Sequence, residues 1–91
     1  MARFDISANK DAARVLKNMV IGIDGIKQVN SGDRIVYWSG DASDYIGQKA
    51  VGRMAYDLAM AGDVRLFQNV ISEEQTELGP LRTFEYMAEV V

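Results

Sequence analysis

The apolar residues of this chain follow a helical spacing in two stretches. From Lys10 onward they recur at i, i+3, i+7 and i+10, which predicts an amphipathic helix with Ser7 or Asn9 as its N-cap. Residues 48–61 repeat the helical spacing and stop at Gly62, a residue suited to the left-handed position after a helix. The predicted inward-facing residues are Ala13, Leu16, Val20 and Ile23 in the first helix, and Val51, Met54 or Ala55, Leu58 and Ala61 in the second.

Three other stretches have the composition or the alternation of β-strands. Residues 34–38 are mostly β-branched or aromatic, which favours a short strand. Residues 64–71 and 81–91 alternate around the polar, acidic segment 72–80, so they predict a hairpin with a long, mobile loop. One hairpin face would carry Phe67, Ile71 and Met87, packed against the first helix or, failing that, forming a dimer or partner surface.

The segments between these elements are polar or rich in glycine. In residues 20–29, Asp24-Gly25 indicates a two-residue hairpin turn, but Gly22 and Gly25 fit equally well the end of the first helix and the start of a short second one. Residues 30–33 predict a turn and residues 39–44 a loop, in which Asp41 or Ser43 would cap the next helix.

Length and composition bound the class of protein. The chain has 91 residues, of which 48% are hydrophobic and 25% charged, so we expect one folded domain over residues 1–91. A domain of this size is marginally stable alone, and a homo-oligomer or a bound partner would help it. We expect no signal peptide and no membrane span, and the absence of cysteine fits a reducing compartment such as the cytoplasm.

The absence of histidine and cysteine restricts the chemistry. It removes thiol and imidazole catalysis, the Ser-His-Asp triad and the usual zinc and haem ligands. Only carboxylates, lysine, tyrosine and hydroxyls remain, and the carboxylates are scattered along the chain. We therefore expect a protein that is not an enzyme and that uses neither a cofactor nor a metal.

The net charge of −3 hides an asymmetry between the two halves of the chain. Residues 1–54 carry eight basic and six acidic side chains, whereas residues 55–91 carry two basic and seven acidic ones. DNA-binding domains are usually basic, and this chain has a pI of about 4.8. Any contact with nucleic acid would therefore use mainly the N-terminal half.

Four segments resemble small winged-helix-like proteins of phages and prophages: Gly32-Asp-Arg-Ile-Val-Tyr37, Leu58-Ala-Met-Ala-Gly62, Val64-x-Leu66-x-Gln68 and Phe84-Glu-Tyr86-x-Ala88. The resemblance implies an α+β, winged-helix-like fold: an N-terminal helix, a short strand, a second helix and a C-terminal β-hairpin. It also implies a regulator that inserts a helix into the DNA major groove while the hairpin touches the backbone. On this chain the groove-facing residues would be Lys49, Arg53 and Tyr56, and the backbone contacts Arg65 and Arg82.

The first functional hypothesis is a phage-type accessory or regulatory protein that binds single- or double-stranded DNA. Phosphates would lie along five cations: Lys10, Arg14, Lys17, Lys49 and Arg53. If the target is single-stranded, Tyr37, Trp38 or Tyr45 would stack on bases. The alternative for the first two is that their strand points one side chain into the core and the other outward.

The second hypothesis is a protein-binding module for host takeover in the bacterial cytoplasm. Glu73, Glu74 and Glu77 lie in the predicted hairpin loop, where they would repel phosphate. An acidic surface of this kind would dock instead on the basic surface of a host enzyme that handles nucleic acid.

Overall fold

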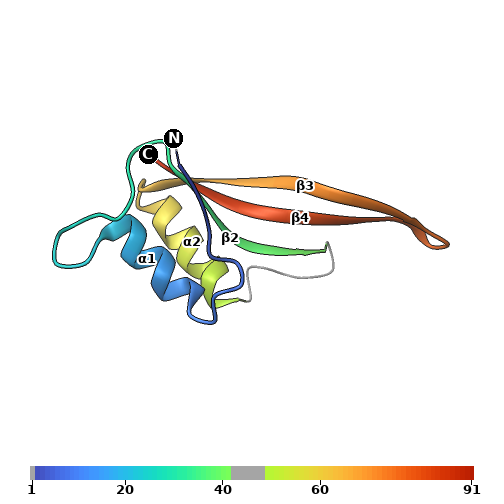
Figure 1. Cartoon of the computed structure of the whole chain (residues 1–91), viewed down its shortest axis with the longest axis horizontal. Helices are drawn as coiled ribbons and strands as arrows, with labels where there is room; N and C mark the ends of the chain where they lie inside the picture. Colours follow the sequence, from blue (N-terminus) through green and yellow to red (C-terminus); the bar gives the residue numbers. More distant parts are fainter. Residues whose placement is uncertain (1, 42–48) are drawn as a thin grey trace.

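The computed structural model describes residues 2–41 and 49–91, in which two helices pack against a four-stranded mixed sheet (Figure 1). The elements follow the order β1 (Arg3–Asp5), α1 (Ala12–Ile21), β2 (Arg34–Asp41), α2 (Ala50–Met60), β3 (Val64–Thr76) and β4 (Gly79–Val90). The predicted α+β class is confirmed, as is the succession of helix, strand, helix and hairpin. The strand β1 was not predicted, because three residues are too few to show an alternation.

The sheet has the strand order β1-β2-β4-β3. β1 pairs with β2 in parallel, and β4 lies between β2 and β3 and pairs antiparallel with both. β2 therefore joins the start of the chain to its end. β3 forms one edge of the sheet.

α1 begins and ends two residues inside the predicted helix. Leu16 and Val20 lie on its buried face as predicted, whereas Ile23 lies beyond the helix and is half exposed. The predicted caps are wrong: the Asn9 side chain accepts a hydrogen bond from the amide of Asp11 at 2.9 Å, and Ser7 donates to Asp5. Both side chains thus stabilise the turn that precedes the helix and leave the first turn of α1 uncapped.

A tight turn follows α1 and settles the ambiguity in residues 20–29. Gly22 ends the helix with a φ of 102°, and a β-carbon there would lie 2.7 Å from the carbonyl oxygen of Ile26. Ile23 then pairs with Ile26 around Asp24 and Gly25, both of which have positive φ. Both predicted signals are therefore used, the helix end and the two-residue turn, and there is no second short helix in this segment.

α2 buries Val51, Ala55 and Leu58, as its spacing predicts. It ends in a Schellman motif: the amide of Gly62 donates to Ala59 O and the amide of Asp63 to Leu58 O, with Gly62 at a φ of 83°. The N-cap residue of α2 is Lys49, which makes no side-chain capping hydrogen bond, and the predicted cap Asp41 belongs to β2. The other predicted cap, Ser43, lies outside the described residues.

The hairpin is longer and its turn tighter than predicted. β3 continues to Thr76 and β4 starts at Gly79, so the predicted long loop of residues 72–80 is wrong. The Thr76 hydroxyl donates to the carbonyl of Gly79 and accepts from the amide of Leu78, which closes the turn. Polar residues form strands here because the outer hairpin projects beyond the helices as an arm with both faces in solvent (Figure 1).

The core lies between the two helices and one face of the sheet. Its centre is formed by Leu16, Ile35, Ala55 and Ala88, each with 0% of its surface exposed. The opposite face of the sheet carries ion pairs. The Arg3 guanidinium reaches across β2 to the Glu85 carboxylate on β4 at 2.8 Å.

The predicted packing of Phe67 and Ile71 against α1 is wrong. Phe67 pairs with Met87 on the face remote from the helices, below the Arg34 guanidinium at 5.8 Å from its ring centre. Ile71 lies at an irregularity in β3, and both Phe67 and Ile71 are at least 40% exposed, whereas Met87 is buried. The alternating sequence pattern placed Phe67 and Met87 on the same face of the hairpin, but it did not show which face the helices cover.

Asp33 joins three distant parts of the chain. Its two carboxylate oxygens accept hydrogen bonds from the amides of Ala2 and Asn30, each at 2.9 Å. Its backbone carbonyl accepts from the amide of Val90, and the Gly32 amide donates to the Val90 carbonyl. The bond from Ala2, followed by that from Asn30, lowers the pKa of the Asp33 carboxyl.

Replacing Leu16 by Ala should lower the free energy of unfolding by about 2–5 kcal/mol, because a fully buried side chain leaves a cavity. Urea unfolding followed by circular dichroism measures this loss. The matched control is Leu78→Ala, at a residue with 100% of its surface exposed, which should change stability by no more than about 0.5 kcal/mol. Equal effects of the two substitutions would contradict the core described here.

Replacing Asp33 by Asn should lower the melting temperature near pH 7. Because folding lowers the pKa of Asp33, its carboxylate stabilises the fold above the unfolded-state pKa, and this contribution is lost as the pH falls below about 4. The difference between wild type and variant should therefore shrink between about pH 7 and about pH 3. Asp24→Asn, in an exposed turn that asparagine adopts equally well, should show no such difference at either pH.

Candidate nucleic-acid interface

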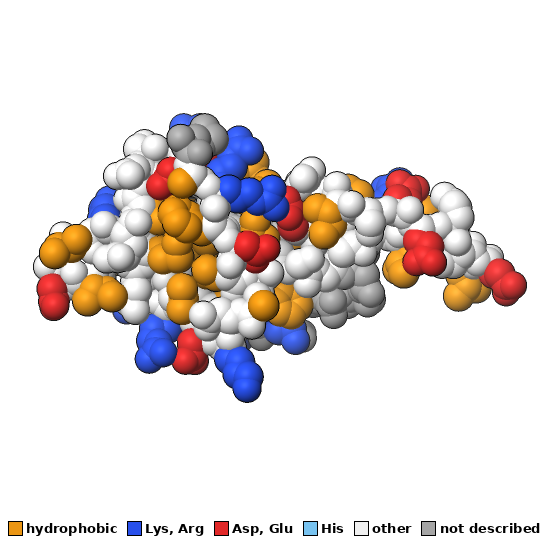
Figure 2. All heavy atoms as spheres, viewed as in Figure 1, with side chains coloured by type: hydrophobic (Ala, Val, Ile, Leu, Met, Phe, Trp, Pro, Cys, Tyr) orange, Lys and Arg blue, Asp and Glu red, His pale blue; other side chains and the backbone are white. Residues whose placement is uncertain are grey.

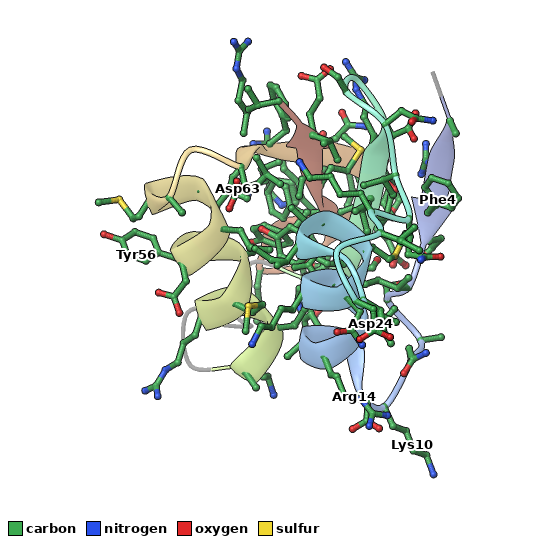
Figure 3. All side chains as sticks on the ribbon, turned by 90° about the vertical axis from the view of Figure 1, so that its left-hand side faces the viewer. Phe4, Lys10, Arg14, Asp24, Tyr56 and Asp63 are labelled. Carbon is green, nitrogen blue, oxygen red and sulfur yellow. The ribbon has the colours of Figure 1, made fainter. Side chains whose placement is uncertain are left out.

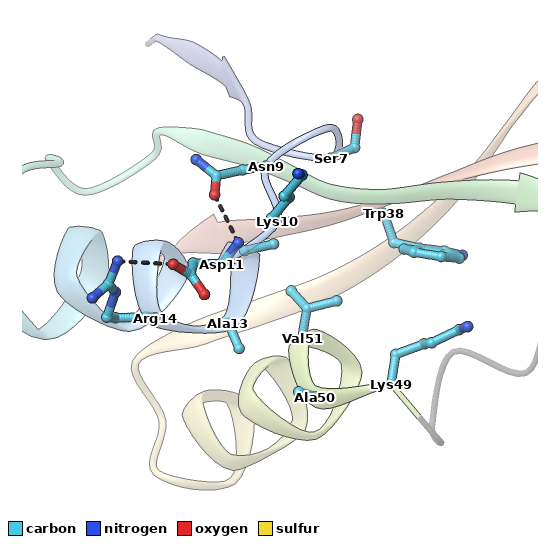
Figure 4. Close-up of a pocket in the computed structure, with 11 residues that line it drawn as sticks. Ser7, Asn9, Lys10, Asp11, Ala13, Arg14, Trp38, Lys49, Ala50 and Val51 are labelled. Atoms are coloured by element: carbon cyan, nitrogen blue, oxygen red, sulfur yellow. Dashed lines mark hydrogen bonds and ion pairs between the residues drawn. The ribbon is translucent and has the colours of Figure 1, made fainter.

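A cleft of about 340 Å³ opens where the first turns of both helices approach β2 (Figure 4). One wall is formed by the turn before α1 and its first residues, and the other by the start of α2, with Trp38 of β2 between them. The lining residues are Ser7, Asn9, Lys10, Asp11, Ala12, Ala13, Arg14, Trp38, Lys49, Ala50 and Val51.

Three of the predicted phosphate-binding cations line this cleft: Lys10, Arg14 and Lys49. Among the described residues of the lining, Asp11 is the one acidic residue, and it binds Arg14, with 2.9 Å between Arg14 Nη2 and Asp11 Oδ2. Three cations and one carboxylate give the described part of the lining a formal charge of +2, in a chain whose net charge is −3. The cleft is therefore suited to an anion.

Both helices begin at the cleft without a side-chain cap. The N-cap residues, Asp11 of α1 and Lys49 of α2, make no side-chain capping hydrogen bond, and neither helix has an acidic residue in its first turn. The first amides of a helix have no acceptor within the helix and carry a partial positive charge. Two such helix ends therefore add to the attraction of the cleft for an anion.

Trp38 lines the cleft because β2 has a bulge. The pairing with β4 shifts between Val36 and Trp38, so that Tyr37 and Trp38 both pack on the core side instead of pointing to opposite faces. Trp38 is partly exposed, its indole Nε1 is buried, and Lys49 Nζ lies over the ring, 5.4 Å from its centre (Figure 4). A planar group and a phosphate could thus be bound side by side.

Tyr37 does not belong to the cleft. It is buried, with its ring 6.4 Å from that of Tyr86, so the hypothesis that it stacks on a base is wrong. The predicted alternative, one aromatic residue inward and one outward, fails as well, because it assumed a regular strand. Tyr45 lies outside the described residues.

The other predicted contacts are exposed but do not line the cleft. Lys17 lies on α1, and Arg53 and Tyr56 continue the exposed row that starts at Lys49 on α2. Figure 3 shows Tyr56 projecting from the side of α2 remote from α1, and Lys10 and Arg14 at the end where the cleft opens.

Arg65 and Arg82 are far from this arrangement. Arg65 lies on β3 opposite Glu89, on the sheet face remote from the helices, and Arg82 lies on the arm, with its Nε 3.5 Å from the Glu73 carboxylate. Glu73, Glu74 and Glu77 are exposed on the arm. Figure 2 shows mostly acidic charged side chains on the outer arm, and basic side chains with an acidic one among them along the lower side of the helical layer. The cations thus fall into three groups, namely those that line the cleft, those paired with glutamates, and exposed ones outside the cleft such as Lys17 and Arg53, and they do not form one continuous face.

Sequence reasoning found the charged and aromatic groups of the cleft but missed the segment that shapes it. Ser7, Asn9 and Asp11 line the wall before α1. Several short polar residues close together before a helix indicate a hydrogen-bonded turn. The sequence pattern was interpreted only as a possible helix cap at Ser7 or Asn9.

Comparisons with known proteins give no match to a protein family, to a curated protein or to a solved structure. The resemblance to phage winged-helix proteins therefore stays a prediction. Within residues 2–41 and 49–91, no helix has the length and apolar character needed to cross a bilayer. In the same part of the chain, the acidic side chains form no cluster of three or more that would hold a metal ion.

The placement of Tyr37 gives a pH-dependent prediction. Burial, together with Tyr86, raises the pKa of Tyr37 to about 12. The neutral Tyr37 side chain therefore makes its full contribution to stability below about pH 10, and this contribution is lost as the pH rises through the folded-state pKa. Between about pH 9 and about pH 11, Tyr37→Phe should lose less stability in urea unfolding than wild type. Tyr56→Phe, at an exposed tyrosine, should follow wild type; the same curve for all three proteins would argue against burial of Tyr37.

Proposed function

We propose that this protein binds single-stranded nucleic acid in the cleft between the two helix starts and β2. The observation that carries the proposal is the convergence of Lys10, Arg14 and Lys49 with Trp38, contributed by three separate segments of the chain. Basic side chains that follow the backbone, combined with an aromatic ring for a base, are the usual elements of single-strand binding. The accessory or regulatory role in a phage-infected bacterium is part of the same proposal.

Each group has a distinct part in the proposed complex. Lys10 and Lys49 would bind phosphates near the amides of the two helix starts, and a base would stack on the accessible part of Trp38. Arg14 is held by Asp11, but both side chains are largely exposed, so exchanging this carboxylate for a phosphate would cost little.

The position of Trp38 favours single-stranded over double-stranded nucleic acid. In the winged-helix mode, α2 would enter the major groove with Lys49, Arg53 and Tyr56, and the hairpin that follows would touch the backbone. The hairpin follows α2 directly, as that mode requires, but its outer part carries three glutamates. A base in a duplex, moreover, cannot stack on a ring recessed in a cleft without leaving the helix.

The single tryptophan of the chain reports directly on this site. Adding an oligothymidylate should change the fluorescence of Trp38 in a saturable way. If three cations contact phosphates, log K should fall with log salt with a slope of about −2. Unchanged fluorescence at low salt, together with unchanged anisotropy of a labelled oligonucleotide, would rule out the proposal.

A matched pair of lysine variants tests the cleft itself. Lys49→Met keeps the length of the side chain but removes its charge, and should weaken binding about tenfold and reduce the salt slope by about 0.7. Lys27→Met removes the same charge from the loop after α1 and should bind like wild type. Because Lys49 lies beside the reporter ring, anisotropy of the labelled oligonucleotide is the measurement for both variants. Equal loss in both would point to non-specific attraction.

The acidic arm supports the second candidate, a module that binds the basic surface of a host protein. Glu74 and Glu77 are exposed on the projecting hairpin and form no ion pair within the described residues. Pull-down from a bacterial lysate should then recover a stoichiometric partner that is lost on Glu74→Lys and Glu77→Lys and is kept on Lys49→Met. A partner lost on Lys49→Met alone would be bound at the cleft instead.

A further inference from the structure

β3 presents an unpaired edge along the whole side of the sheet. It is 13 residues long, pairs with β4 on one side and, among the described residues, has no strand on the other. Backbone amides and carbonyls at such an edge are a template for pairing with another chain. Proteins that stay monomeric usually protect a long edge with lysine, proline or an inward-pointing charge.

The middle of this edge has no lysine, proline or charged residue, and its one irregularity is the shift in the pairing with β4 between Val70 and Ser72. Residues 66–72 are uncharged and contain no proline. Four apolar side chains in this stretch are at least 38% exposed: Leu66, Phe67, Val70 and Ile71. The charges lie only at its two ends, where Arg65 comes before the stretch and Glu73 and Glu74 come after it.

We propose that β3 pairs antiparallel with β3 of a second copy of this chain, so that two sheets join into one. In an antiparallel pair, Arg65 of each copy lies opposite Glu73 and Glu74 of the other copy, so the same attraction acts at both ends of the pair. The apolar stretches of the two strands lie opposite each other between these ends. A parallel pair would instead place like charges side by side, which is unfavourable. The arrangement of charge around the apolar stretch thus selects the second copy and its orientation.

The proposed assembly closes at two copies. A two-fold axis through the middle of the edge uses both β3 strands. The opposite side of the sheet offers only short stretches, namely the three residues of β1 and the part of β2 beyond Val36. A single pair of edge strands buries less than a standard interface, so we expect a reversible dimer with a dissociation constant of about micromolar order. The pairing does not involve the residues that line the cleft, so it does not depend on nucleic-acid binding.

Light scattering after size-exclusion chromatography of the full chain tests the dimer. At about 100 μM, wild type should have twice the mass of one chain, since a micromolar dimer is then mostly assembled. Val70→Lys places a charge in the edge and should raise the dissociation constant at least about tenfold. The control is Ile26→Lys, at an exposed apolar residue in the turn after α1, which should leave the dimer intact. A monomer, or open-ended assemblies that grow with concentration, would overturn the proposal.

The natural absence of cysteine permits a second test that does not depend on destabilising the edge. Asn69→Cys places one thiol at the middle of β3, and Glu77→Cys places one at the tip of the arm. In the antiparallel dimer a short bis-maleimide should join two Asn69→Cys chains but not two Glu77→Cys chains, whose tips lie at opposite ends. Cross-linking of both variants would indicate a parallel pair, and cross-linking of neither would exclude this interface; either result rejects the proposal.

Discussion

The packing of two helices on one face of the sheet is the contact on which the remaining structure depends. Leu16 and Ala55 bring the helices onto Ile35 and Ala88, and these four side chains are removed from water completely. Among the described elements, both helices cover the same face of the sheet, and this packing brings the starts of both helices next to β2. The cleft therefore depends on the core, because the packing of α1 and α2 on the sheet fixes the distance between its two walls.

Electrostatics divides the surface into two kinds of region. Arg3, Arg34 and Arg82 each pair with a glutamate, so these cations contribute little attraction at long range. Lys10, Arg14 and Lys49 lie where the helices start, beside amides that also attract anions. An acidic protein can in this way carry a local cluster of positive charge, and its overall pI is a poor guide to such a cluster.

Most of the fold followed from the sequence, and the failures have identifiable causes. Helical spacing located both helices, because each buries one continuous stripe. The hairpin turn was misplaced because Ser72 to Pro80 is polar, and polarity marks a loop only where a strand would otherwise have a buried face. The bulge at Tyr37 could not be predicted, since it depends on pairing with a strand some fifty residues later in the sequence. For the same reason, the sequence identified Lys10, Lys49 and Trp38 but not their meeting in one cleft.

The binding of both chain ends to the loop around Asp33 has a consequence for how this domain can be connected to others. Ala2 and Val90 both bind this loop, and Figure 1 shows the termini side by side, at the end of the helical layer opposite the first turns of the helices. A short peptide linker between them would close the backbone into a ring with little entropic cost. Any partner fused at either end would leave from that corner, so it would not cover the cleft.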